Sequence, residues 1–441
     1  MQPAPSDPAR PSASDRADAA WQWDTDADDR PAAPAEVLSG GGDEDGGPRP
    51  TRRRLLAGAG ALAAGAAVWA FARSAGGPDP APPRPLPTRA AGPEPLWTYR
   101  GRESAAPERL SGRPAVPVLL SREGLQVLDP AAGTPLRMLT FAAAKADWPN
   151  DVDQPNGRVV VGTDRVFTTS NGHLDSHHLT DPASEWSLPL PGEAGNGAAT
   201  LFGCADDIVY GEVTPRPYTG GGELFAVRVP DRRVLWHRPS PLGERPLVPA
   251  GPAGGRVPVL DSSAGGSRLA LLDAASGTRL WAVPAESGLS WAVADAEHVY
   301  APEGPAGLRA LRLADGTPHW SVAPGPADQW RLLPPVAGGA LVYLFRDNGL
   351  VSAHTAATGA QLWEHRLPFR LDRRSRPLLA GPALYVPGPA AAGVRALDAA
   401  TGEERWTFRD SGPGVDVWSL SNDVGHLFAG HDDVLHALPL I

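Results

Sequence analysis

The chain has 441 residues, among them 50 glycines, 50 prolines and 14 tryptophans, and its formal net charge is −10. Many turn-forming residues together with many tryptophans favour short strands joined by tight turns, because disordered chains are poor in aromatic residues. The net charge is negative, so the chain lacks the strong positive potential that attracts nucleic acid. The single cysteine, Cys204, excludes an internal disulfide and a cysteine-based metal cluster.

Residues 1–50 form the most acidic part of the chain. They contain 11 acidic residues and four arginines, which gives a net charge of −7, and they show no apolar periodicity. A segment of this composition buries too little apolar surface to offset the entropy of ordering. We therefore predict a disordered acidic N-terminal segment.

Residues 51–75 combine the motif Thr51-Arg52-Arg53-Arg54-Leu55-Leu56 with an uncharged run, 55–72, that is rich in alanine and glycine. The run has 18 residues, the lower limit for a bilayer span, and the preceding arginines favour a cytoplasmic N-terminus. The motif resembles a twin-arginine export signal, whereas the long segment before it favours an uncleaved anchor. We predict a single-pass membrane anchor with the rest of the chain extracytoplasmic; secretion after signal cleavage is the alternative.

Residues 76–95 contain eight prolines, and such a composition predicts a semi-rigid extended linker. The linker leads into 96–441, where a pattern of about 40 residues recurs. Its clearest copies end at Trp281, Trp320, Trp363 and Trp406, each four residues after a glycine. Counted from Trp236, successive tryptophans lie 45, 39, 43 and 43 residues apart. Such periods are typical of propeller blades or helical arrays, and strand-like runs cut by turn residues favour an all-β propeller.

The repeat predicts eight blades. Seven intervals separate Trp97 from Trp406, and three strand-like runs follow Trp406 without a tryptophan strand of their own. The unpaired segment Leu96–Arg100 is expected to join them, because closing the ring removes its exposed strand edges. A seven-bladed ring is the alternative if 138–200, where the pattern is weakest, forms only one blade.

The repeated residues are predicted to be structural. In each turn an aspartate accepts hydrogen bonds from backbone N–H groups, a glycine supplies positive φ, and the tryptophan that follows packs between blades. The turn residues are Asp273, Gly277, Gly316, Gly359, Asp398 and Gly402, and the blade-docking residues are Trp97, Trp186, Trp236, Trp281, Trp320, Trp363 and Trp406.

The run from Val394 to Gly402, followed by Trp406, resembles the repeat of the PQQ-like (quinoprotein alcohol dehydrogenase-like) β-propeller family. The order of cytoplasmic segment, span, linker and propeller is similar to that of membrane-anchored actinobacterial sensor kinases, although no kinase motif is present. The resemblance implies a propeller over 96–441. It also implies either partner binding or a dehydrogenase that holds pyrroloquinoline quinone (PQQ) with calcium.

The dehydrogenases of the family place a vicinal cysteine pair over the quinone, which Cys204 alone cannot supply, and no calcium ligand set is recognisable by motif. We therefore expect a non-enzymatic, membrane-tethered module without a cofactor. It would bind a partner protein, an envelope component or a small ligand on one face of the ring, where loops gather. The alternative is a PQQ- and calcium-dependent quinoprotein dehydrogenase.

The run from His173 to His178 is the densest metal-type cluster of the sequence. On a strand, His173, Asp175 and His177 share one face, and two imidazoles with a carboxylate could hold a metal. Polar residues on the surface or along the channel are the other interpretation. The last blade contains His426, His431 and His436, whose spacing of five alternates faces on a single strand and argues against a shared site.

Overall fold

The computed structural model describes residues 90–441 except 102–115, 122–123, 141–158, 171, 192–197, 206, 215–221, 241–244, 248–254, 262–265, 286–288, 305–306, 324–330, 413 and 415–416. The predicted acidic segment, the predicted anchor and most of the predicted linker lie outside these residues. Within the described part of the chain, no helix combines the length and the apolar character needed to cross a bilayer.

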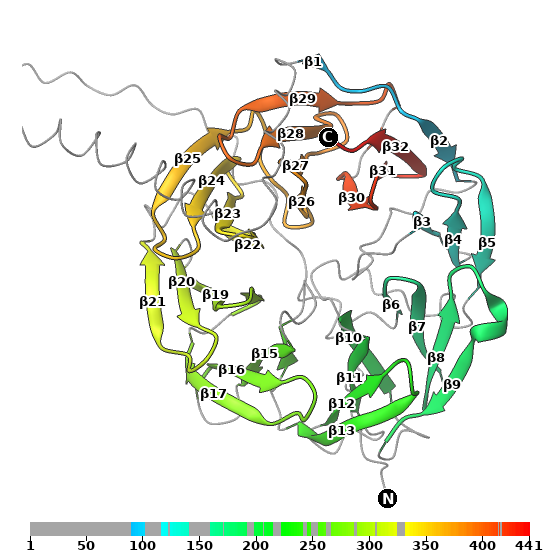
Figure 1. Ribbon diagram of the computed structural model, residues 1–441, viewed down its shortest axis with the longest axis vertical. Coiled ribbons are helices and arrows are strands. Elements are labelled where there is room, and N and C mark those ends of the chain that lie inside the picture. Colours follow the sequence, from blue (N-terminus) through cyan, green and yellow to red (C-terminus); the bar gives the residue numbers. More distant parts are fainter. Residues whose placement is uncertain are drawn as a thin grey trace, which may run out of the picture. The chain divides into compact units, whose positions relative to one another are not determined.

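Eight sheets surround a central axis, and their strands are antiparallel apart from one added strand in blade 7 (Figure 1). Consecutive strands pair in order within a sheet, and we call them A to D from the axis outward; the three described strands of blade 1 take positions B to D. Blade 1 contains β3 (Val118–Ser121), β4 (Gly124–Leu128) and β5 (Pro135–Leu139). Blade 2 contains β6 (Val159–Val161), β7 (Arg165–Ser170), β8 (His173–His178) and β9 (Trp186–Pro189), with the 3-10 helix η3 (Pro182–Ser184). Blade 3 contains β10 (Ala198–Ala205), β11 (Ile208–Thr214), β12 (Gly222–Arg228) and β13 (Arg233–Ser240), and blade 4 contains β14 (Arg245–Pro246), β15 (Arg256–Asp261), β16 (Arg268–Asp273) and β17 (Arg279–Pro284).

The remaining blades complete the ring. Blade 5 contains β18 (Val293–Ala294), β19 (His298–Glu303), β20 (Gly307–Arg312) and β21 (Pro318–Val322). Blade 6 contains β22 (Leu332–Gly338), β23 (Leu341–Arg346), β24 (Leu350–Thr355) and β25 (Gln361–Arg366), and blade 7 contains β26 (Leu378–Ala380), β27 (Ala383–Pro387), β28 (Val394–Asp398) and β29 (Glu404–Phe408). Blade 8 contains β30 (Ser419–Asn422), β31 (His426–His431), β32 (Val434–Pro439) and β2 (Trp97–Arg100). The eight-bladed prediction is confirmed. The seven-bladed alternative is wrong, because 138–200 contains the whole of blade 2 and the start of blade 3.

The N-terminal strand β2 closes the ring, as predicted. It pairs antiparallel with β32 in the register Trp97↔Ala437, so blade 8 takes its D strand from the start of the described chain. A second N-terminal strand, β1 (Ala90–Ala91), lies within the predicted linker. It pairs parallel with β29, with Ala90 opposite Trp406, and gives blade 7 a fifth strand.

The core lies between neighbouring blades, because the flat faces of adjacent sheets pack against each other. One cluster joins Tyr343 and Phe345 of blade 6 to Leu384 and Val386 of blade 7. The B and C strands, which are covered on both faces, are correspondingly apolar along their length: all five residues of β27 are buried.

The predicted docking tryptophans reach the C-to-D turn of the following blade. The indole nitrogen of Trp236 donates to the carbonyl oxygen of Ala274 at 2.8 Å, and Trp281 makes the same contact with Leu313 at 2.9 Å. Equivalent bonds run from Trp97 to Pro130, from Trp320 to Ala356 and from Trp363 to Ala399. The ring of Trp186 packs against Phe167, and Trp406 is buried against Tyr385.

The turn glycines lie under these indole rings. Gly277, Gly316, Gly359 and Gly402 all have positive φ, and a Cβ atom added to any of them would come within 2.7 Å of the preceding blade's tryptophan. The turn aspartates accept backbone hydrogen bonds: Asp273 from Ser276, and Asp398 from Ala400 and Thr401. In blade 1 Arg137 occupies the tryptophan position and donates to the carbonyl oxygen of His178 at 2.7 Å.

Replacing Gly402 by alanine is expected to cost more stability than replacing Gly339. Both glycines have positive φ, but a Cβ at Gly402 would lie 2.5 Å from the Trp363 ring, whereas nothing lies within 4 Å of one at Gly339. Gly339→Ala therefore measures backbone strain alone, about 1–2 kcal/mol. Gly402→Ala should add about 1–3 kcal/mol for the steric overlap. Equal losses in urea unfolding of the two variants would contradict the contact.

The stability of the ring is expected to fall as the pH drops through the histidine range. Burial lowers the pKa of the His354 imidazole; its bond to the Gly359 carbonyl and the charge of Glu364 oppose this shift, and Arg346 adds to it. The unfolded chain takes up the proton first, so this contribution is complete above about pH 6.5 and declines as the pH falls toward the folded pKa. Urea unfolding at about pH 7.5 and 5.5 should give a smaller pH difference for His354→Asn than for the parent chain.

Candidate functional site

The two ends of the ring differ in the length of their chain connections. In a four-strand meander, A-to-B and C-to-D connections lie at one end, the turn end, and B-to-C and D-to-A connections lie at the other, the connection end. The C-to-D connections between described strands span four to seven residues. Six of the seven D-to-A connections between described strands span at least eight residues: 140–158, 190–197, 285–292, 323–331, 367–377 and 409–418. The connection end therefore offers more chain for recognition.

An arginine-rich segment, residues 366–376, begins at the last residue of β25 and runs along the connection end. It contains five arginines and one aspartate, a net charge of +4, although the chain as a whole carries −10. Arg366, Arg370 and Arg373 are exposed, and three-quarters of the Arg370 side chain is accessible. The overall net charge of −10 hides this segment, because it averages the arginines with the acidic remainder of the chain.

The backbone of the arginine-rich segment is fixed on the ring. Leu367 and Leu371 are buried in the core between blades 6 and 7. The Leu371 amide donates to the Asp347 carbonyl oxygen at 2.9 Å, and the Ser375 amide donates to the Asp372 carbonyl at 2.9 Å. Two carboxylates lie within it or beside it: Asp372 pairs with Arg374, and Asp347 pairs with Arg370. The arginines thus form a positioned cationic surface.

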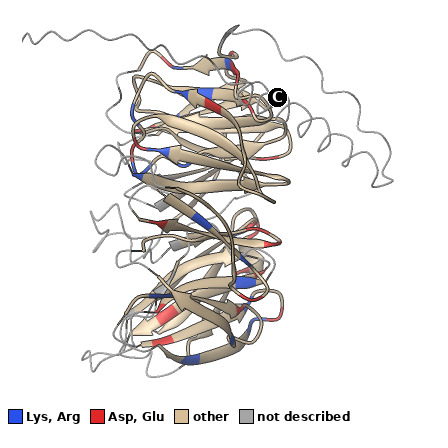
Figure 2. Ribbon diagram, turned by 90° about the vertical axis from the view of Figure 1, so that its left-hand side faces the viewer, with Lys and Arg blue, Asp and Glu red and all other residues tan. Residues whose placement is uncertain are grey.

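The positive charge of this segment is local. In the side view of Figure 2, basic and acidic positions are scattered over the outer strands, without a stripe of one sign. A local field steers an oppositely charged partner to one place on the ring, and its effect fades beyond the Debye length.

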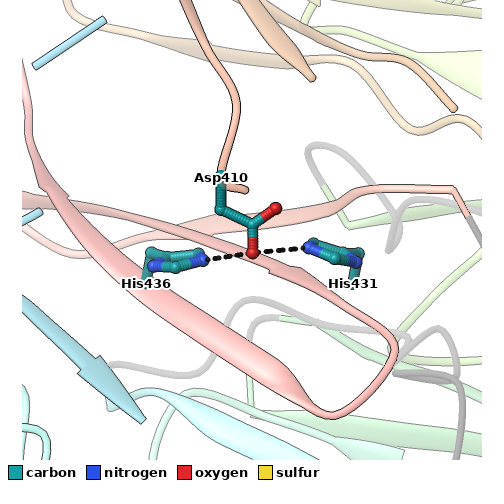
Figure 3. Close-up of side chains that lie close together, drawn as sticks. All are labelled: Asp410, His431 and His436. Atoms are coloured by element: carbon teal, nitrogen blue, oxygen red, sulfur yellow. Dashed lines mark hydrogen bonds and ion pairs between the residues drawn. The ribbon is translucent and has the colours of Figure 1, made fainter. Parts of the chain in front are cut away.

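A buried group of three side chains lies at the same end, between blades 7 and 8. Asp410 belongs to the D-to-A connection after β29, while His431 and His436 flank the tight turn between β31 and β32. Both histidines point their Nε2 atoms at one oxygen, Oδ2 of Asp410, at 3.0 Å for His431 and 3.3 Å for His436 (Figure 3). The three candidate ligand atoms lie within 4.8 Å of one another, the only such group among the described residues.

The outer nitrogens of both rings have partners of their own. His431 Nδ1 lies 2.8 Å from Oδ2 of Asp432, and His436 Nδ1 lies 2.9 Å from Oγ1 of Thr98 in the closing strand β2. The remaining oxygen of Asp410, Oδ1, accepts the Gly412 amide at 3.3 Å. Each member of the group is therefore held from two sides.

Aromatic rings enclose the group. The ring centroids of Trp418 and His431 lie 4.2 Å apart, and those of Phe408 and His436 lie 5.1 Å apart, edge to face. Burial opposes ionisation of Asp410, yet the hydrogen bonds and charges of the two histidines keep the pKa of its carboxyl below the ordinary value. Burial also lowers the pKa of the His436 imidazole, although Asp410 opposes that shift.

The predicted cluster on β8 is arranged differently. His173, Asp175 and His177 alternate with the buried Leu174 and Ser176, so they share one face. Asp175 accepts hydrogen bonds from Ser170 and Ser187. His177 Nδ1 lies 3.5 Å from Oε2 of Glu185. Among the described residues, the candidate ligand atoms of these three do not gather as those of the Asp410 group do.

From the sequence, His431 and His436 were not expected to share a site, because side chains five residues apart on one strand point to opposite faces. The two instead occupy adjacent strands joined by a tight turn, with His431 opposite Val434 and His436 opposite Ala429. Residues 429 and 431 share a face, so His436 joins His431 on that face. A hairpin reading of this spacing would have found the pair. His426 is not part of the group and pairs with Asp423.

The family model described as "Outer membrane protein assembly factor BamB" matches residues 220–337 and 306–436, the part of the chain with the clearest turn-and-tryptophan repeats. The chain belongs to the PQQ-like β-propeller family. Three solved structures are similar to this PQQ-like propeller. The computationally designed Ika8 protein matches at a TM-score of 0.56 and 14% identity, covering 78% of this chain and 99% of that one.

Two natural proteins are more distant. Quinohemoprotein alcohol dehydrogenase from Comamonas testosteroni has a TM-score of 0.49 and 11% identity, covering 80% of this chain and 78% of its own. BamB from Moraxella catarrhalis has a TM-score of 0.39 and 18% identity, covering 64% and 96%. No curated protein matches the sequence. At 14% identity, the match to the designed protein supports the fold alone.

Proposed function

We propose that this PQQ-like propeller is a non-enzymatic, membrane-tethered extracytoplasmic module that binds an acidic segment of a partner protein on its connection end. The arginine-rich segment carries the proposal, because it sets five arginines against one aspartate on a chain that is otherwise acidic. Buried Leu367 and Leu371 hold its backbone in place, so little conformational entropy is lost when a partner binds. Arginine is also the cation best suited to bidentate pairing with carboxylates.

The matching family supports a protein partner. Its description is that of an assembly factor, and a propeller without its own chemistry can serve assembly as a rigid docking platform. The tether is proposed from the sequence alone, from the apolar run 55–72 and the arginines before it.

Two features support a non-enzymatic role over the quinoprotein alternative. Cys204, a partly buried residue of β10, is the only cysteine, so the vicinal pair expected over a quinone cannot form. The metal-type group of the described residues offers two imidazoles and one carboxylate, whereas calcium takes oxygen ligands. These residues do not fit a calcium-bound quinone.

Binding of a fluorescent oligoglutamate peptide tests the acidic-partner proposal. We expect Arg370→Gln/Arg373→Gln to weaken binding roughly 2- to 30-fold, since each partly exposed ion pair contributes about 0.2–1 kcal/mol. Arg233→Gln/Arg312→Gln is the matched control: it removes the same charge from exposed arginines beside C-to-D turns, at the turn end. Equal weakening in the two double variants would show that net charge alone attracts the peptide and would overturn the site.

Two further measurements separate the other parts of the proposal. A C-terminal alkaline phosphatase fusion should be active, because that enzyme folds only outside the cytoplasm; an inactive but intact fusion would overturn the topology. Titration with PQQ and calcium, followed by absorbance and melting temperature, should give no saturable binding. Saturable binding with a raised melting temperature would favour the dehydrogenase.

A further inference from the structure

We propose that Asp410, His431 and His436 form a zinc site that fastens the closure of the propeller. The three come from two blades: Asp410 leaves blade 7, and the two histidines belong to the hairpin of blade 8. Thr98 adds the closing strand β2 through its contact with His436. An ion at this point would link the last two blades to the strand that completes the ring.

The two carboxylates beside His431 favour the binding of a cation. The ring is 1% exposed and lies between two carboxylates, with Nε2 toward Asp410 and Nδ1 toward Asp432. An ionised carboxylate only accepts hydrogen bonds, so each nitrogen of this ring must meet its carboxylate with an N–H or with a bound cation. A metal ion bound at Nε2 would lie between the ring and Asp410, and the Nδ1–H would remain for Asp432.

The orientation of both rings matches that of metal ligands. Histidines that bind metals present one nitrogen to the ion and donate the other N–H to a carboxylate, carbonyl or similar acceptor, which fixes the ring. Here both Nε2 atoms point inward, and both Nδ1 atoms meet oxygens of Asp432 and Thr98. The Thr98 hydroxyl can accept this hydrogen bond as well as donate it.

Spacing and chemistry favour zinc. Tetrahedral zinc holds ligands at about 2.0–2.1 Å, which separates neighbouring ligand atoms by about 3.3–3.4 Å. The distances from Asp410 Oδ2 to the two Nε2 atoms are 3.0 and 3.3 Å, so small movements open room for the ion. Two imidazoles and one carboxylate select a borderline transition metal over calcium or magnesium. Three protein ligands leave the fourth position for water or a partner's side chain.

The test uses the full-length chain, purified in detergent and stripped with a chelator. We expect one zinc per chain by calorimetry, a higher melting temperature with zinc, and visible cobalt bands of tetrahedral type when Co²⁺ replaces it. Asp410→Asn keeps an oxygen for the histidine hydrogen bonds and therefore the fold, checked by circular dichroism, but should lose zinc uptake. Asp432→Asn, which keeps an acceptor but removes the negative charge of the outer partner of His431, should weaken binding about 10- to 100-fold.

His426→Gln and His177→Gln are the matched controls, because both residues are partly buried histidines beside carboxylates, outside the group. Both should keep full zinc uptake. The proposal is overturned if the parent chain takes up no zinc, if uptake persists in Asp410→Asn, or if it is lost only in a control. None of these results bears on the arginine-rich segment, so partner binding is judged separately.

Discussion

Replacing Trp406 by alanine is expected to lower the free energy of unfolding by about 3–5 kcal/mol. The side chain is 4% exposed and belongs to the core cluster between blades 7 and 8, with its ring 5.7 Å from that of Tyr385. Truncation would leave a cavity that two rigid sheets cannot close, because β1 and β28 hold the strand of Trp406 from both sides. Chemical unfolding, followed by tryptophan fluorescence, measures the loss.

Leu280→Ala is the matched control for this substitution. Leu280 also lies on a D strand, but 43% of it is exposed, so its loss should change stability by no more than about 0.5 kcal/mol. A Trp406 variant as stable as the Leu280 variant would show that the tryptophan does not hold the blades together.

Removal of the closing strand should have the larger structural effect. A chain that begins at residue 102 lacks β2 and leaves the edge of β32 unpaired, together with the Phe428 and Leu435 side chains that Trp97 and Tyr99 cover. Unpaired edges and apolar surface promote association. We expect oligomers in size-exclusion chromatography and the loss of a single cooperative melting transition.

A chain that begins at residue 93 is the control for the closing strand. It lacks β1 but keeps β2, so it should remain monomeric and lose only the two-residue pairing with β29. Identical behaviour of the two truncated chains would mean that β2 is dispensable and that the ring stays closed without it.

The fold was predictable because its signal is repeated. Trp281, Trp320, Trp363 and Trp406 each follow a glycine by four residues, and eightfold repetition of one unit makes a local pattern reliable. In blade 1, where the tryptophan is missing, Arg137 takes its place and donates to a carbonyl oxygen of the next blade, as the indoles do. β1 has only two residues, too few to leave a periodic signal.

The candidate sites were harder to predict because they depend on contacts between distant parts of the chain. His431 and His436 meet through the register of one hairpin, which sequence alone leaves open until the turn is assigned. Asp410 joins them only because closure of the ring brings blade 7 against blade 8, and no local motif encodes that contact. The arginines of the arginine-rich segment can be counted in the sequence. Their position at the connection end follows only from the strand order.

The order of β1 and β2 along the chain also determines how the ring responds to force. If the chain is held from its N-terminal side, tension reaches Ala90 and Ala91 before it reaches Trp97. The parallel pairing of β1 with β29 therefore takes the load first, and the closing strand is loaded only after that pairing has failed. Under tension from the N-terminal side, the short fifth strand of blade 7 would therefore separate before the closing strand does.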